Sequence, residues 1–379
     1  MPTASTSWLQ VAALRLQRQH LDRRAAPERL VDVAGDMVGM HAQVASFAEL
    51  QFAARVDEIR RSDVRDAIAD RRLVKTWAMR GTLHLLTADD LWQFVAAWPT
   101  RDSTRTPAFL KYFDVTPAQL DAIDDAIADV LDAEPRTRAE LAEAVAARIG
   151  GDDIGERLSS GWGQFLKPAA GKGILAFGPD RGRNVSFVSP EAWLGGRPTA
   201  QDEPLVALGR LLERWLARFP GATREAAARW WGIASRPTMT RALAAAAADI
   251  SEVDIEGTKG WVRTQDVAAL SRAEPPIGVR LLPGFDPYVN DLPRRVEALL
   301  PVKHHELVYR TAGWITPVVL VGGRVAGTWE LDAKNGIAIQ PFARWPKAVD
   351  RGIAQEADRF AAFLDRALRI EVATPLASA

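Results

Sequence analysis

The 379-residue chain contains no cysteine. A chain without thiols forms no disulfide framework, uses no thiolate nucleophile and holds no cysteine-ligated zinc or iron–sulfur cluster. Histidine is scarce, and two of the five residues, His304 and His305, are adjacent, which is a poor spacing for two ligands of one metal. We therefore expect neither a metal site nor a bound cofactor.

An excess of charge of one sign and a long apolar run are also missing. The 48 basic side chains balance the 48 acidic ones, which argues against a protein that is cationic all over. Such a chain can still bind nucleic acid if its positive charge gathers on one surface. No segment reaches the roughly 20 apolar residues of a membrane helix, and no basic segment precedes the first apolar patch. These absences predict a cytoplasmic protein that does not bind membranes.

The first third of the chain changes its periodicity. Apolar residues recur at helical spacing in two segments, a capping-box pattern at Ser46 opens a short third helix, and Ser62 opens a fourth. Two short strands around the turn "MRG" follow. Helices followed by a hairpin are typical of a winged helix. We expect helices over residues 8–21, 27–40 and 62–72, a short helix that starts at the capping-box pattern of 46–49, and the strands within 73–87.

The same order recurs twice. Thr137 and Thr223 each precede an arginine, and both are predicted N-caps of a first helix. We interpret the chain as three unequal tandem units, and chance similarity among alanine-rich helices is the alternative. The candidate recognition helix and wing of the second unit cover 159–173 and 173–189, and those of the third cover 235–250 and 252–264.

From Val279 the sequence is rich in short β-type runs separated by glycine, proline and asparagine turns. A small barrel or sandwich is expected there, closed by an amphipathic helix over 348–369. The predicted fold class is mainly α with β (α+β), with tandem winged helices and a C-terminal β-rich, barrel-like region. We expect domains over 1–115, 116–200, 201–277 and 278–379.

His41 and Gln43 are the first candidates for chemistry. The apolar stripe of the preceding helix places position 41 on the buried face, and a continuing helix would turn Gln43 about 200° away. If the chain leaves the helix before Ala45, residues two apart face the same side, and both groups can converge on one cavity. The alternative is a satisfied core histidine beside a surface glutamine.

Such a pair suits a limited chemistry. Neutral imidazole accepts a proton, and a carboxamide both donates and accepts hydrogen bonds, so together they could orient a water molecule with His41 as a weak general base. The pair lacks the two carboxyl groups of an ordinary glycosidase. It would therefore serve only a reaction whose leaving group departs easily.

Four stretches, in order along nearly the whole chain, resemble one family. They are "MVGMHAQVASF", "TWAMRGTLHLLTADDLW", "LLPGFDPYV" and "VLVGGRVAGTW". Together they are similar to the winged-helix DNA glycosylases of the AlkZ and YcaQ type. The resemblance implies tandem winged helices and metal-independent hydrolysis of the N-glycosidic bond of bulky or crosslinking N7-alkylated purines. Some members protect antibiotic producers from their own DNA-alkylating products.

The catalytic signature of that family is glutamine, an apolar residue and a second glutamine. In the YcaQ branch the third residue is aspartate. The matching triplet is His41, Ala42 and Gln43, so the first glutamine has become histidine. The resemblance assigns the catalytic role to His41 and Gln43. No lysine nucleophile is required, which implies a monofunctional hydrolase. Bulky or crosslinked adducts do not turn easily into a tight pocket, so we expect an open, concave site. Its partner would be double-stranded DNA carrying alkylated purines.

Candidate DNA contacts are basic side chains near the predicted hairpins and the turn "FDPY", although solvated hairpins and an ordinary β-turn explain the same residues. Without a dimerisation coiled coil, we expect a monomer. The alternatives are a non-catalytic winged-helix DNA-binding protein or transcriptional regulator, and an inactive family member that binds damaged DNA. The candidate contacts are Arg71, Arg72, Lys75, Arg80, Lys167, Lys172, Arg181, Arg183, Phe285, Asp286 and Tyr288.

Overall fold

The computed structural model describes residues 5–101, 103–150, 152–159, 163–233, 235–246, 249–294, 296–332 and 336–376. Two compact units share the chain. The first is built from residues up to Arg65, from Leu212–Arg229 and from Ala246 onward, and the second from Asp66–Leu211 and Trp230–Ala245. In the described part of the chain, no helix has both the length and the apolar character needed to cross a membrane.

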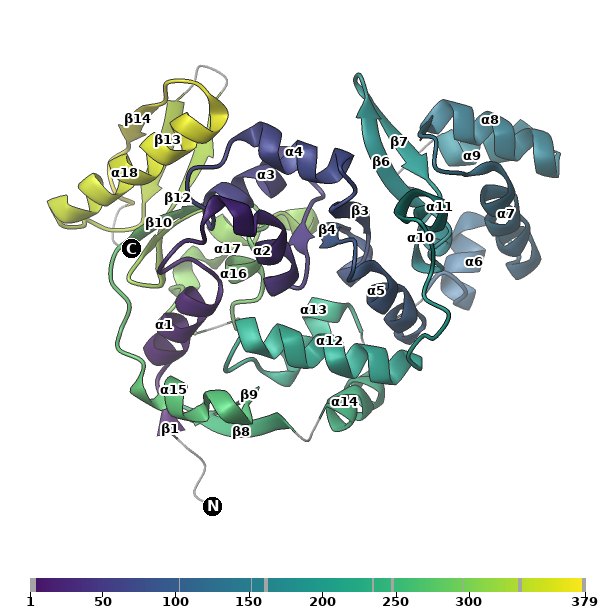
Figure 1. Cartoon of the computed structure of the whole chain (residues 1–379). Coiled ribbons are helices and arrows are strands. Elements are labelled where there is room, and N and C mark those ends of the chain that lie inside the picture. Colours follow the sequence, from purple (N-terminus) through teal and green to yellow (C-terminus); the bar gives the residue numbers. More distant parts are fainter. Residues whose placement is uncertain are drawn as a thin grey trace. The chain divides into compact units, whose positions relative to one another are not determined.

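The C-terminal part of the first unit is an open five-stranded sheet in the order β10-β11-β12-β13-β14. Helix α18 (Lys347–Leu364) covers one of its faces and leads into β14, which pairs parallel with β13 (Figure 1). The predicted β-rich region and amphipathic helix are confirmed, but the sheet is not closed into a barrel, and a strand follows the helix. The strands are β10 (Val279–Leu282), β11 (Val318–Val321), β12 (Arg324–Leu331), β13 (Gly336–Pro341) and β14 (Arg369–Val372).

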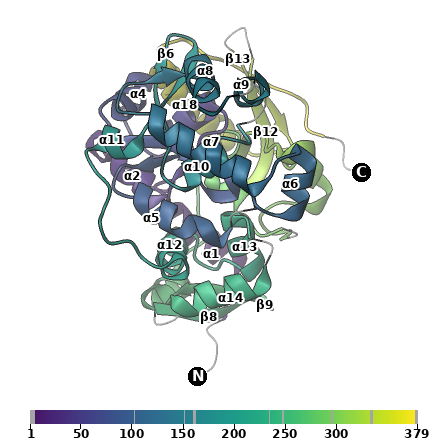
Figure 2. The ribbon, with the colours of Figure 1, turned by 90° about the vertical axis from the view of Figure 1, so that its right-hand side faces the viewer.

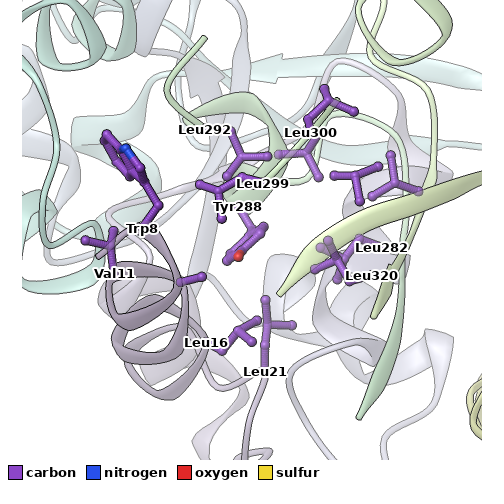
Figure 3. Packing of buried hydrophobic residues seen from close by; sticks show 14 of the residues in the cluster. Trp8, Val11, Leu16, Leu21, Leu282, Tyr288, Leu292, Leu299, Leu300 and Leu320 are labelled. Carbon is purple, nitrogen blue, oxygen red and sulfur yellow. The ribbon is translucent and has the colours of Figure 1, made fainter. Parts of the chain in front are cut away.

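The core of the first unit joins the two ends of the sequence. Helix α1 (Trp8–Arg18) begins at a capping box between Ser7 and Gln10. Its buried side chains pack against residues that follow position 280, including Leu282, Tyr288 and Leu300 (Figure 3). Burial of this apolar surface is the main force that holds the N-terminal helix against the C-terminal segments.

The segment after α1 bends twice before the next long helix. Helix α2 (Leu30–Asp36) ends early because Val38 and Gly39 adopt positive φ angles of 55° and 95°. Strand β2 (Met40–His41) and helix α3 (Ala45–Ala53) follow. The helix predicted over 27–40 is thus too long, but its expected end before Ala45 is confirmed.

Two predicted helix starts are wrong in detail. Helix α3 has Val44 as its N-cap without a side-chain hydrogen bond, so Ser46 forms no capping box. Helix α4 (Arg61–Ala69) already includes Ser62, and the carboxylate of Asp63 accepts the backbone N–H of Arg60 at 2.7 Å. Asp63, in the first turn of the helix, therefore satisfies the backbone N–H of the residue before the helix, and Ser62 is not the N-cap.

The sheet of the second unit joins two hairpins. Strands β3 (Leu73–Trp77) and β4 (Leu83–Thr87) form the first hairpin, and β6 (Ala176–Arg181) and β7 (Asn184–Val188) form the second. One residue pair, Lys75 with Phe177, links the hairpins, and β5 (Arg136–Thr137) adds to β7. Both predicted hairpins are confirmed.

Helices pack beside the second hairpin in the same unit (Figure 2). Thr137 caps α8 through a capping box with Glu140, as predicted. Within the expected recognition helix over 159–173, the described residues are helical at Ser159, where the unpredicted α9 ends, and in α10; residues 160–162 lie outside the described ranges. These helices are α7 (Pro117–Val130), α8 (Arg138–Ile149), α9 (Asp152–Ser159) and α10 (Lys167–Gly171).

Helix α13 (Arg224–Trp231), in the third set of helices, begins as predicted, because the Thr223 hydroxyl accepts the backbone N–H of Ala226 at 3.1 Å. A hairpin follows these helices along the chain, and β1 (Ser5–Thr6) pairs with its first strand. Helices followed by a hairpin therefore occur three times, which is the order of tandem winged helices. The elements are α12 (Pro204–Arg218), α13 (Arg224–Trp231), α14 (Arg236–Ala245), β8 (Ile250–Ile255) and β9 (Thr258–Arg263).

Shorter elements complete the described chain. In the second unit they include the helix that follows β4 along the chain. In the first unit they include the single turn after the "FDPY" loop. These helices are α5 (Leu91–Ala97), α6 (Pro107–Phe113), α11 (Pro190–Leu194), α15 (Val267–Arg272), α16 (Pro287–Asn290) and α17 (His305–Val308).

Candidate functional site

His41 lies at the end of β2 with its ring against Phe285. The two rings are stacked, with centroids 4.7 Å apart and planes inclined by 18°. Only 5% of His41 is exposed, whereas Gln43, in the bend before α3, is exposed. The chain is not helical at either residue, as the sequence predicted, but the two side chains differ in their access to solvent.

Phe285 connects His41 to two further aromatic rings. Its centroid lies 5.1 Å from that of Trp314 in an edge-to-face arrangement and 6.3 Å from that of Phe47. Phe47 and Trp314 also meet edge to face, at 5.9 Å. We call His41, Phe47, Phe285 and Trp314 the aromatic cluster. Edge-to-face and offset contacts at these distances are favourable because the positive ring edge meets the negative face.

The loop that carries Phe285 is tightly confined. A Cβ atom added to Gly284 would come within 2.4 Å of the Phe47 ring and 2.9 Å of the Ile315 carbonyl oxygen. Phe285 itself has a φ of 59°, a conformation that costs free energy for a residue with a side chain. Surrounding contacts must therefore hold this loop in place.

A fully buried ion pair supplies those contacts. The Arg55 guanidinium donates to both carboxylate oxygens of Asp286, at 2.7 and 2.8 Å, and neither side chain is exposed to solvent. Asp286 also accepts the backbone N–H of Tyr288 at the start of α16, at 2.9 Å. Bidentate arginine–carboxylate pairs fix both distance and orientation, so α3 and the Phe285 loop are held together.

The same network reaches the backbone of His41. Arg55 donates to the Gln51 carbonyl oxygen at 3.2 Å, and the Gln51 carboxamide donates to the His41 carbonyl oxygen at 3.1 Å. Phe285, beside Asp286, stacks on the His41 ring. Backbone and ring of His41 are thus positioned by one connected set of contacts, which we call the Arg55 network: Gln51, Arg55, Asp286 and Phe285.

Two of the predicted DNA contacts have a structural role instead. Asp286 and Tyr288 are both 0% exposed. The Tyr288 hydroxyl donates to the Gly323 carbonyl oxygen at 2.8 Å, and burial raises the pKa of Tyr288 above its ordinary value of 10.0. DNA cannot reach either side chain in this conformation, so their assignment as DNA contacts is corrected. Phe285 remains half-buried within the aromatic cluster.

The end of α2, which leads to His41, is fixed by charge. Asp36 accepts hydrogen bonds from the His20 ring at 2.7 Å and from Arg218. Burial opposes ionisation of Asp36, but the bonds and charges of His20, Arg218 and Arg29 outweigh it and lower the pKa of Asp36 below 3.8. Arg214 also donates to the Gly35 carbonyl oxygen at 3.2 Å. The last turn of the helix is therefore anchored just before the chain bends.

A cavity of about 740 Å³ opens beside Phe47 and Trp314 in the first unit. Trp314, an aromatic cluster member, is 41% exposed. Apolar and charged side chains share its lining. The lining residues are Ser46, Phe47, Leu50, Arg61, Arg310, Trp314, Thr316, Pro317, Trp329, Glu330, Leu331, Leu364 and Arg366.

Basic residues around the first hairpin of the second unit are engaged within the protein. Arg71 donates to the Trp193 carbonyl oxygen at 2.9 Å, and Arg80 donates to the Trp230 carbonyl oxygen at 3.2 Å. The Lys75 ammonium lies 5.0 Å from the Phe177 ring centroid, a cation–π contact. Arg72 makes only an exposed pair with Asp70, at 3.2 Å.

The second hairpin and its helices show the same pattern. Burial lowers the pKa of Lys167, with a smaller contribution from Arg101. For Lys172 burial is outweighed by Asp124, 2.7 Å away, so its pKa is raised. Arg181 pairs with Glu140 at 2.7 Å, whereas Arg183 is exposed at the hairpin tip. Of the predicted basic contacts, Arg72 and Arg183 are thus the most open to a phosphate.

Sequence reasoning missed the residues that support His41. Arg55 follows Gln51 by one helical turn, and a charged residue inside the apolar run "ELQFAAR" is a signal that a buried partner exists. Its partner, Asp286, is 231 residues away, so the pattern alone could not identify it. Within the ranges that the structure describes, no three histidine or acidic side chains gather as metal ligands.

Comparisons with known proteins identify the family of this chain. The family model for DNA glycosylase AlkZ-like proteins matches residues 34–363. The "Interstrand DNA cross-link repair glycosylase" of Streptomyces sahachiroi is 36% identical over 353 residues, which are 93% of this chain and 95% of that protein. The solved structure of Streptomyces sahachiroi DNA glycosylase AlkZ is 35% identical, with a TM-score of 0.89 over 97% of this chain and all of that chain. The chain belongs to the AlkZ-like DNA glycosylases, and these enzymes are hydrolases.

Proposed function

We propose that this glycosylase hydrolyses the N-glycosidic bond of N7-alkylated purines in double-stranded DNA, including bulky and crosslinking adducts. The observation that carries the proposal is the placement of His41 and Gln43 on a fixed, non-helical segment beside the aromatic cluster. The name of the Streptomyces relative, which specifies interstrand crosslink repair, supports the substrate class.

The nature of the leaving group explains why His41 and Gln43, which are weak catalytic groups, are sufficient for this reaction. Alkylation at N7 makes the purine cationic, so when the C1′–N9 bond breaks, its electron pair neutralises the base and positive charge develops on the sugar. A water oxygen then bonds to C1′ while its proton passes to the His41 imidazole, and the Gln43 carboxamide orients the water. The products are a free neutral base and an abasic site. No acid is needed to protonate the departing base.

Histidine in place of the family's first glutamine adds a requirement. Only the neutral imidazole accepts a proton, whereas the carboxamide of glutamine does not change its protonation state near neutral pH. We expect the wild-type rate to fall on the acid side as His41 becomes protonated. The His41→Gln variant restores the family's motif and should lack that acid limb. Rates of base release across pH, for both proteins on the same DNA, measure the difference.

The assignment of Gln43 is tested by its removal. The protein is incubated with duplex DNA treated with simple or bifunctional alkylators, and released bases are identified by mass spectrometry. Gln43→Ala should slow release of N7-alkylguanine by at least about 100-fold, because the water loses its positioning group. Gln17→Ala, which removes an exposed glutamine of α1, is the matched control. Release by Gln43→Ala at the wild-type rate would remove the catalytic assignment.

Binding to damaged DNA without hydrolysis is the second candidate. The low exposed fraction of His41 and the loss of the family's first glutamine favour it. Tight binding to alkylated duplexes with no freed base would establish this function instead. In either case we propose a monomer that acts on DNA at the nucleoid, with protection against DNA-alkylating natural products as a biological role.

A further inference from the structure

The cavity beside the aromatic cluster is larger than a simple alkylated base requires. Its volume of about 740 Å³ lies within the roughly 300–1,000 Å³ of sites that take drug-sized ligands. A methylated purine would leave most of that space unfilled. The cavity therefore fits an additional, larger group.

The cavity wall is suited to a flat apolar group. Trp314 lines the cavity and is 41% exposed, and Phe47 and Leu364 contribute further apolar surface. A large aromatic side chain in contact with water offers a face on which a planar ligand can stack. Thr316 also lines the cavity, but its hydroxyl oxygen is buried and has no hydrogen-bond partner among the residues described.

Ring contacts connect this wall to the candidate catalytic residue. His41 stacks on Phe285, and Phe285 meets the edge of Trp314, at centroid distances of 4.7 and 5.1 Å. A substituent on a base held at His41 therefore needs to extend past only one ring to reach Trp314. The cavity and His41 belong to the same compact unit, whose core includes both ends of the sequence.

The charges around the cavity match a ligand attached to DNA. Arg61, Arg310 and Arg366 line it, against the single carboxylate of Glu330. Arg61 is paired with Glu49, which lies outside the lining. A positive border around an apolar wall suits a neutral aromatic group that arrives with flanking phosphates.

We propose that this cavity binds the planar aryl portion of a bulky adduct on the alkylated purine, with Trp314 as the stacking surface. The inference rests on the proposed function, since it assumes that an alkylated purine lies at His41. Contacts with the aryl group would favour large adducts over methylated bases. The site thus sets preference among adducts, and the water at His41 and Gln43 performs the hydrolysis.

Binding can be measured separately from hydrolysis. In a Gln43→Ala background, affinity is compared for duplexes that carry either N7-methylguanine or guanine with an N7-anthracenylmethyl group. Adding Trp314→Ala should weaken binding of the aryl duplex about tenfold, which is the effect expected for loss of one stacking partner. The loss of affinity for the aryl duplex should be at least about fivefold larger than the loss for the methyl duplex. Trp345→Ala removes a half-buried tryptophan that does not line the cavity and should leave both affinities unchanged.

A second variant fills the cavity while Trp314 stays in place. Leu364, the half-buried last residue of α18, lines the cavity, and Leu364→Trp should occlude it. We expect Leu364→Trp to weaken binding of the aryl duplex more than binding of the methyl duplex. When Gln43 is intact, the same variant should slow single-turnover release of the aryl-substituted base more than release of the methylated base. Equal effects on both duplexes, or none, would overturn the cavity proposal. Failure of the wild type to release either base would instead overturn the proposed function, while the affinity ratio would still decide the cavity.

Discussion

His41 and the basic residues of the β6–β7 hairpin differ in the surroundings of their polar groups. Around His41, the Arg55 network connects a ring, a backbone carbonyl and a fully buried ion pair. On the hairpin, Arg181 has an exposed partner, Glu140, and Arg183 extends from the tip. One region is fixed by desolvated contacts, and the other presents charges that solvent and ions can screen.

The two regions are therefore suited to different tasks: the first to holding a catalytic group in position, the second to attracting DNA. Desolvated hydrogen bonds and ion pairs hold an atom to within tenths of an ångström, which a water-positioning group requires. Exposed charges contribute little to stability, but they can be transferred to DNA phosphates at low cost. Pairing, more than the number of basic residues, therefore decides which cations are available to DNA.

The largest expected effect comes from breaking the buried ion pair. Arg55→Leu leaves Asp286 charged, buried and without its arginine, which should lower the free energy of unfolding by about 3–5 kcal/mol. The double variant Arg55→Leu/Asp286→Asn removes both charges and keeps an acceptor for the Tyr288 N–H, so most of that stability should return. Denaturant unfolding measures both.

An exposed pair provides the control for this prediction. Asp57→Asn disrupts the contact with Arg359, whose side chain is 43% exposed, and should cost less than about 1 kcal/mol. If Arg55→Leu were no more destabilising than Asp57→Asn, the contrast between a desolvated and a screened region would be wrong.

An intermediate effect is expected at Asp36, and it depends on pH. Its pKa is lower in the folded protein than the ordinary 3.8, so ionised Asp36 stabilises the fold fully above about pH 4, and this contribution is lost as the pH falls through the folded value. Asp36→Asn should therefore lower the free energy of unfolding by about 1–3 kcal/mol at neutral pH. The gap between wild type and variant should close below pH 4. A gap independent of pH would exclude the ionised carboxylate as its source.

The smallest effect is expected on the hairpin. Arg183→Ala should reduce the slope of the logarithm of DNA affinity against the logarithm of salt concentration by about one. Arg181→Ala should change it less, because Glu140 already neutralises that cation. Fluorescence anisotropy with undamaged duplex DNA across a salt series provides the measurement. A larger change for Arg181→Ala would mean that pairing within the protein does not limit DNA contact.

Local features of the fold were predictable because they depend on neighbouring residues. The caps at Thr137 and Thr223 and the paired strands of the hairpins follow from short patterns. The end of helix α2 was also anticipated, but for the wrong reason: positive φ angles at Val38 and Gly39 end it, and Ser46 forms no capping box. A four-residue capping-box motif does not indicate the backbone conformation of the residues that precede it.

The support of the candidate site was not predictable, because its partners are far apart along the chain. The family resemblance predicts that Asp286 lies near DNA, yet Asp286 is buried against Arg55. Likewise, Lys172 and Arg181 were chosen for their charge, and only the structure shows their acidic partners. Single residues of the right type could be identified, whereas their exposure depends on which distant segments meet.

The core that joins α1 to the segments after position 280 has a consequence for biosynthesis. While the ribosome is still making the middle of the chain, the segment that carries His41 has no Asp286 to complete its support. Domains usually fold in order from the N-terminus as they emerge. Here the apolar face of the nascent N-terminal helix is covered only after the segments that follow position 280 have been translated, so the support of His41 is completed only then.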